Sequence, residues 1–213
     1  WEPATVIVAG DAAGPAPVRL ARRTGWPLLA EPSSGARVHP EALPAVAVLA
    51  DQLASTVRRV IVYGHPTLFG HVTALLGRRD VDLVVAGGPR WPDPAHHASL
   101  VVPAATQITV PEGGSGRPEA LAWQQRWRAA AAAAVQAVGQ LVDNDPPTGP
   151  GVARAVAAAL PAHAMLIMGS SALIRDLDWA DPWSAPRAVV ANRGLAGIDG
   201  PVSTAWGAAL AQQ

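Results

Sequence analysis

The chain has 213 residues, of which half are hydrophobic and only 15% are charged. Sixteen basic and sixteen acidic residues cancel, so the formal net charge at pH 7 is zero. A nucleic-acid groove or a polybasic membrane patch normally leaves a positive excess, so the balanced charge argues against both kinds of partner. The hydrophobic content excludes an intrinsically disordered chain and allows a sizeable core.

The sequence contains neither cysteine nor lysine. Without cysteine there are no disulfide scaffolds, thiolate zinc sites or thiol nucleophiles, and this composition fits a cytoplasmic protein. Without lysine there is no Schiff-base chemistry and no P-loop lysine. No apolar run reaches the roughly 18 residues of a membrane span.

In the first ninety residues, short apolar runs alternate with helical patterns. Strands are predicted over residues 5–9, 27–30, 59–64 and 81–86, and helices over 17–24, 44–53 and 68–76. Near-continuous apolar strands that alternate with helices are typical of a parallel sheet buried on both faces. The fold class predicted is therefore α/β, a Rossmann-like parallel sheet with helices on both faces.

Two short edge strands are expected next, at 100–102 and 107–110, followed by a linker-like stretch at 111–118. An alanine-rich helix is predicted over 119–142, and the run DNDPPTGP at 143–150 ends it. We expect a domain boundary here, with one α/β domain over 1–145 and the start of another over 146–213.

The segment after the break contains a new alternation of helices and strands. Helices are predicted at 152–160 and 202–211, and strands at 164–168 and 187–190. Two strands with two or three helices are too few to close a core alone. We therefore interpret residues 146–213 as the opening part of a second domain.

Two local patterns suggest ligand sites, and both have simpler interpretations. Gly10-Asp11 follows a strand as a nucleotide-binding turn would, but the G-x-G-x-x-G pattern is absent and nearby prolines remove amide donors. His96 and His97 beside Asp93 could suggest a metal, yet adjacent histidines on a proline-rich loop rarely converge on one ion. A plain strand–helix turn and loop packing are favoured.

The carboxyl end of the strand at 164–168 carries Ser170 and Ser171, where open parallel sheets bind ligands. A helix N-cap formed by either serine is an equally good interpretation. Asp176 and Asp178, near Arg175, are most simply a solvated, self-paired helix turn.

Three longer motifs carry a family resemblance. Residues 169–176 read GSSALIRD, residues 192–200 read NRGLAGIDG and residues 203–205 read STA. Together they resemble the thiamine-diphosphate-dependent 2-succinyl-5-enolpyruvyl-6-hydroxy-3-cyclohexene-1-carboxylate synthases of menaquinone biosynthesis. GWPL at 25–28 and RWPDPAHH at 90–97 resemble the central domain of that family more loosely. The resemblance covers nearly the whole chain, from the central domain into the start of the pyrophosphate-binding domain.

The resemblance implies an enzyme that adds decarboxylated 2-oxoglutarate to isochorismate and releases carbon dioxide. It implies thiamine diphosphate and Mg²⁺ as cofactors, small anionic substrates, and a homodimer or homotetramer in the cytoplasm. By similarity Ser171 and Arg175 would contact substrate, Arg193 would hold a carboxylate, and Ile198 would support the bent cofactor. An arginine fork suits a carboxylate because it makes two parallel charge-assisted hydrogen bonds.

The chain also departs from the family pattern. The first domain with its cofactor-activating glutamate is missing, and the chain ends before the metal motif of the third domain. We therefore expect this fragment to be inactive and to bind no cofactor. Relatives often carry arginine around His65 and Gly70, which leaves Arg90 as the candidate for a regulatory anion site on the central domain. Local pairing of Arg90 with Asp93 is the favoured alternative.

Two other functions stay open from the sequence alone. One is a stand-alone nucleotide-binding module, since related central domains have a Rossmann-like build. The other is a subunit-packing module, because low charge and eight tryptophans suit a buried interface.

Overall fold

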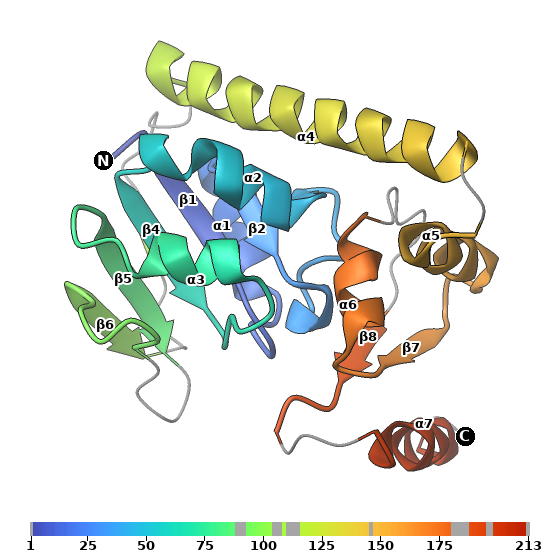
Figure 1. The fold of residues 1–213 in the computed structure, drawn as a ribbon. Helices are drawn as coiled ribbons and strands as arrows, with labels where there is room; N and C mark the ends of the chain where they lie inside the picture. The colour runs from blue at the N-terminus through green and yellow to red at the C-terminus, as the bar shows by residue number, and fades with distance from the viewer. Residues whose placement is uncertain are drawn as a thin grey trace.

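The computed structural model describes residues 2–87, 93–103, 108–109, 116–144, 147–179, 188–194 and 198–211. Within these ranges the chain forms a six-stranded parallel sheet and a separate two-stranded parallel sheet (Figure 1). The order in the larger sheet is β3-β2-β1-β4-β5-β6, and β7 pairs with β8 in the smaller one. The predicted α/β class with a parallel sheet is confirmed.

The six strands of the larger sheet are short and mostly buried. They are β1 (Thr5–Ala9), β2 (Leu28–Ala30), β3 (Ala42–Leu43), β4 (Arg59–Tyr63), β5 (Asp82–Gly87) and β6 (Leu100–Pro103). The central strands are rich in Val, Ile and Leu because both faces of the sheet are covered there. β3 was not predicted, since two residues are too short a run to give a strand signal.

Helices cover the two faces of this sheet unequally. α2 (Val46–Leu53), α3 (Gly70–Leu76) and α4 (Pro118–Asn144) pack on one face, with the 3-10 turn η2 (Ala54–Thr56) after α2. On the other face α1 (Ala16–Thr24) packs against β1 and β2. Gly25 ends α1 in the left-handed region at φ 71°, as its place after the helical pattern predicts.

α4 is the longest helix and runs across α2 toward the C-terminal part of the chain (Figure 1). Trp127 is fully buried in the core beneath α4, and Trp123 meets it edge to face with ring centroids 5.6 Å apart. The Trp123 indole N–H donates to the Thr5 carbonyl at 2.9 Å, which ties α4 to β1. These contacts explain why an alanine-rich sequence lies fixed on the sheet.

The C-terminal part contains α5 (Gly149–Ala159), β7 (Met165–Met168), α6 (Ala172–Asp176), the 3-10 turn η3 (Leu177–Trp179), β8 (Ala188–Ala191) and α7 (Gly200–Leu210). Among the described residues its own cluster of buried apolar side chains is small and contains Ala153, Ala157, Leu177 and Val189. α7 has no buried residue. Large apolar side chains on and before it are exposed, with Ile198 at 84% and Trp206 at 70%.

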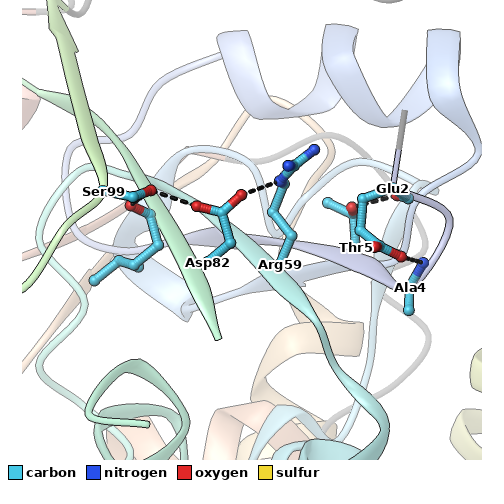
Figure 2. Close-up of polar contacts among 7 residues, drawn as sticks. Glu2, Ala4, Thr5, Arg59, Asp82 and Ser99 are labelled. Carbon is cyan, nitrogen blue, oxygen red and sulfur yellow. Dashed lines mark hydrogen bonds and ion pairs between the residues drawn. The ribbon is translucent and has the colours of Figure 1, made fainter. Parts of the chain in front are cut away.

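Polar contacts at the amino ends of the strands fix the sheet register (Figure 2). Arg59 and Asp82 are direct neighbours on β4 and β5, and the Arg59 Nε donates to the Asp82 carboxylate at 2.6 Å. Ser99 donates to the other Asp82 oxygen. Burial by itself raises the pKa of Asp82, but the hydrogen bonds from Ser99 and Arg59 bring it below its usual value.

Two further sequence expectations are settled by the described residues. Within the edge strand predicted at 107–110, only residues 108–109 are described, and they lie outside any strand. None of the helices in the described ranges has both the length and the hydropathy needed to cross a membrane.

The buried Trp127 gives a stability prediction. Trp127→Ala removes the side chain that joins α4 to the sheet, so the free energy of unfolding should fall by about 3–5 kcal/mol. Urea unfolding followed by circular dichroism measures this loss. Trp206→Ala is the matched control and should change the free energy by less than about 0.5 kcal/mol, because Trp206 is mostly exposed. Equal losses in the two variants would contradict this account of α4.

Candidate functional site

The carboxyl ends of β1, β2 and β4 form one edge of the larger sheet, the edge where parallel α/β sheets bind ligands. The residues that follow these strands include Asp11 after β1, Glu31 after β2, and His65 and Thr67 after β4. A candidate site therefore begins here, on loops supported by a rigid sheet.

The loops after β1 and β4 touch backbone to backbone. Asp11 and His65 exchange two hydrogen bonds, with N···O distances of 3.1 and 2.9 Å. A Cβ at Gly10 would lie 2.0 Å from the Pro66 nitrogen, and Gly64 has φ 67°. Only glycine fits at both positions, so the sequence GD after β1 serves to hold the β4 loop in place.

This contact supports the simpler interpretation of the Gly10-Asp11 turn. The Gly10 amide donates to the Tyr63 carbonyl at 2.8 Å, and the Asp11 amide donates to His65. A nucleotide phosphate at this turn would need such amides as donors. Both are already used within the protein.

Glu31 is the most deeply buried acid of this edge, with 1% of its surface exposed. Its Oε1 accepts the Leu68 amide at 2.7 Å, and the Thr67 backbone amide also favours the ionised form of the carboxyl. Burial raises the pKa of Glu31 to about 7, while the Leu68 amide and the Arg193 charge oppose the rise. The Asp11 charge raises it further. Glu31 is thus an acid poised near neutrality.

The second half of the site comes from the smaller sheet. Ser170 follows β7 and donates to the Asn192 carbonyl, which follows β8, at 2.7 Å. The Asn192 side-chain Nδ2 in turn donates to the Thr204 hydroxyl of α7 at 3.0 Å. These bonds join the carboxyl ends of β7 and β8 to the start of α7.

Arg193 connects the two halves. Its Nη2 donates to the Thr67 hydroxyl on the loop after β4, 126 residues earlier in the chain. Arg193 therefore lies where the carboxyl edges of the two sheets meet, close enough to Glu31 for its charge to act on that carboxyl.

The other predicted site residues lie around this junction or outside it. Ser171 occupies the N-cap position of α6, is exposed and makes no capping hydrogen bond with its side chain. Arg175 is exposed in the last turn of α6, and Ile198 is exposed before α7. The structure thus places Ser171 and Arg193 at the same sheet edge. Arg90 lies outside the described residues, and so does its proposed pairing with Asp93.

Asp178 corrects one prediction from the sequence. The expected solvated, self-paired turn is wrong at this residue, because Asp178 is fully buried. Its carboxylate accepts the Ala47 amide at 3.2 Å and its carbonyl accepts the Ala45 amide at 3.2 Å. It therefore caps the N-terminus of α2, where Ala45 supplies no capping side chain.

The surroundings of Asp178 fix the C-terminal part against the larger sheet. Arg37, itself nearly fully buried, donates to the Asp178 carbonyl at 3.4 Å. Burial raises the pKa of Asp178, and the Arg37 charge opposes the rise. Arg37 and Asp178 are 141 residues apart in sequence, so no local sequence pattern predicts their contact.

The histidine pair at 96–97 packs its loop. The His97 Nε2 lies 2.8 Å from the Leu76 carbonyl, and the Asp93 carboxylate accepts the Ala95 and Ala98 amides. Over the part of the chain that is described, no three His, Cys, Asp or Glu side chains gather as metal ligands. The loop-packing interpretation is the one these contacts support.

Removal of the Asp178 carboxylate gives a testable prediction. Asp178→Ala leaves the partly buried Ala47 amide without its acceptor and should cost about 2 kcal/mol of unfolding free energy. Asp178→Asn keeps an acceptor oxygen and should cost less than half of that. Hydrogen exchange of the first-turn amides of α2 should speed up in the alanine variant alone. Equal exchange in the two variants would argue against this capping role.

The buried Glu31 gives a pH-dependent prediction. Its folded pKa lies above the unfolded value, so the stability it contributes is full below pH 4.5 and is lost as the pH rises through 7. The unfolding free energy of wild type minus that of Glu31→Gln should thus fall by up to about 3 kcal/mol between pH 4.5 and 8. Urea titrations at several pH values measure this difference.

Glu41→Gln is the control for this titration. Its hydrogen bond from Arg22 lowers the pKa of Glu41, so Glu41 titrates below this pH range. The corresponding difference for Glu41 should stay flat between pH 5 and 8. If the difference in unfolding free energy for Glu31→Gln were also independent of pH, the raised pKa of the buried Glu31 carboxyl would be contradicted.

Comparison with curated proteins identifies relatives of the chain. It is 45% identical to the 2-succinyl-5-enolpyruvyl-6-hydroxy-3-cyclohexene-1-carboxylate synthase of a Nocardioides species, over 98% of the chain and 40% of that protein. The synthase of the same name from Kineococcus radiotolerans is also 45% identical, over 98% of the chain and 39% of the relative. The Leifsonia xyli synthase is 37% identical, over 99% of the chain and 41% of the relative.

No family model matches the chain. The chain spans about 40% of the length of the curated relatives it matches. The match nevertheless runs through both sheets and includes the three motifs that carry the sequence resemblance. The chain is therefore homologous, along nearly its whole length, to a segment of the 2-succinyl-5-enolpyruvyl-6-hydroxy-3-cyclohexene-1-carboxylate synthases.

Proposed function

We propose that the full-length protein carrying this chain is a cytoplasmic, thiamine-diphosphate-dependent synthase that adds decarboxylated 2-oxoglutarate to isochorismate. The observation that carries the proposal is the position of Arg193, held at the meeting point of two carboxyl edges in a chain homologous to these synthases. Both substrates are carboxylates, and a guanidinium fork is the side chain best suited to grip one.

Three residues of this chain would contact the substrates. Arg193 would hold a carboxylate, since among the described residues one of its five N–H donors is used, by the Thr67 hydroxyl. Ser171 would supply a hydroxyl from the exposed N-cap of α6. Arg175 is exposed one turn further along α6 and would add a second positive charge on the same side of the site as Ser171.

The proposed domain division follows the sequence, with a central domain over 1–145 and the start of the pyrophosphate-binding domain over 146–213. The separate two-stranded sheet and the small core of the second segment support it. So does α7, whose apolar side chains are exposed here. We propose that the chain by itself does not turn over substrate.

The described residues do not form a complete site for the proposed cofactor. Ile198 is 84% exposed, and no set of three metal ligands occurs in the described ranges. Ile198 would offer an apolar contact, whereas Mg²⁺ and the diphosphate are assigned to none of the described residues. When bound, thiamine diphosphate would supply the carbon nucleophile, and the residues of this chain would bind and orient the carboxylates.

The proposal includes assembly into a homodimer or homotetramer. Exposed Ile198, Val202, Trp206 and Leu210 support it, because apolar side chains gathered in one segment are usually covered in a complete protein. The rest of the polypeptide or a second subunit would provide that cover.

The full-length enzyme should turn over 2-oxoglutarate and isochorismate in the presence of thiamine diphosphate and Mg²⁺. Arg193→Gln should lower kcat/KM about 100-fold, because it removes the charged partner of a substrate carboxylate. Steady-state kinetics with carbon dioxide release as the readout measure the loss. The isolated chain should give no turnover.

Arg154→Gln is the matched control for this experiment. Arg154 makes a surface ion pair with Asp143 at the α4–α5 connection, away from the proposed site, and its removal should leave kcat/KM within about twofold. Failure of the wild-type enzyme to use either substrate would refute the proposed function. Unchanged kinetics in Arg193→Gln would refute the role given to Arg193.

A further inference from the structure

We propose that Glu31 and Thr67 of the larger sheet are positioning residues, which hold the Arg193 guanidinium in the orientation that binds a substrate carboxylate. This inference rests on the proposed function and extends it, because it gives the central domain a part in substrate binding. The three side chains come from the ends of three different strands, β2, β4 and β8.

The first argument is geometric. The loop after β4 contacts Glu31 on one side and Arg193 on the other. Its Leu68 amide donates to the Glu31 carboxyl at 2.7 Å, and its Thr67 hydroxyl accepts from Arg193 Nη2. The loop itself cannot move freely, because Gly10 and Gly64 lock it against the loop after β1. Arg193 is therefore anchored to a rigid element of the larger sheet.

The second argument is electrostatic. Glu31 is buried, and the backbone amides of Leu68 and Thr67 that act on its carboxyl carry no charge. A buried carboxylate without a counter-charge is costly, and a nearby cation lowers that cost. Two charged groups act on Glu31 most strongly. Arg193 favours its ionised form, and Asp11 opposes ionisation. Arg193 is the cation that this buried acid has available from the facing segment.

The third argument concerns the cost of ordering. A free arginine side chain has about 2 kcal/mol of rotamer entropy to lose when it binds a ligand in a two-pronged geometry. An arginine already bonded to the Thr67 hydroxyl and attracted by the Glu31 charge loses less, so binding is stronger. Thr67 and Glu31 would thus affect KM through the orientation of Arg193, without themselves touching the substrate.

The test uses the full-length enzyme and a double-mutant cycle. Glu31→Gln and Thr67→Val, both of similar shape to the native residues, should each raise KM for one carboxylate substrate about tenfold and change kcat less than threefold. In an Arg193→Gln background the same two substitutions should change KM less than twofold, because the group they position is gone. Thr67→Ser restores the hydroxyl and should recover most of the loss seen in Thr67→Val.

Glu41→Gln serves as the control, since Glu41 pairs with Arg22 on α1 and should leave KM unchanged. Unchanged KM in Glu31→Gln and Thr67→Val would overturn the inference. So would an equal effect in the Arg193→Gln background, because the residues would then act independently of Arg193. A lower melting temperature with normal KM would show a structural role alone and would also overturn it.

A second readout does not depend on activity. The ¹³C chemical shift of the Glu31 carboxyl reports its pKa, which should rise in Arg193→Gln because an attractive charge is removed. A rise together with no turnover by the wild-type enzyme would refute the proposed function but keep the electrostatic coupling between Arg193 and Glu31. No rise would show that Arg193 does not face Glu31, and the inference would fail whatever the activity.

Discussion

The docking of Asp178 into the N-terminus of α2 fixes the relation between the two sheets. A helix N-terminus leaves amide groups without partners, and the N-cap residue of α2 is Ala45, whose side chain cannot cap them. Asp178 supplies the acceptors from η3, 131 residues further along the chain. Because the carboxylate is fully buried there, the contact tolerates little displacement, and β8 is held with its carboxyl end toward the larger sheet.

The position of Arg193 follows from that docking. Once β8 is fixed, its first charged residue after the strand reaches the Thr67 hydroxyl and the neighbourhood of Glu31. The two sheets meet at their carboxyl edges, so loops from both can contribute to one site. The larger sheet then does more than support the chain, because its loops carry the groups that face Arg193.

Sequence patterns were sufficient to predict the fold class and the part of the candidate site that lies at the edge of the smaller sheet. Buried β-branched runs such as Arg59–Tyr63 marked the strands, and Gly25 marked a helix end. The motifs around Ser171 and Arg193 pointed to the edge of the smaller sheet. Glu31 carried no motif, and the Leu68 amide that its carboxyl accepts lies 37 residues further along the chain. Asp178 was misjudged because its neighbours Arg175 and Asp176 suggested a local pair, whereas its partners lie on α2.

The length of α4 has a consequence for how this chain can vary. Its 27 residues correspond to roughly 40 Å of helix, Trp127 anchors its first half in the core, and α5 begins at Gly149 after its C-terminal end. The alanine-rich turns of α4 that follow Trp127 determine the direction of α5, because each residue adds a fixed rotation around the helix axis. Insertion of a single residue would rotate everything downstream by about 100° around the helix axis. Insertions and deletions should accordingly be confined to the loops, while α4 keeps a constant number of residues.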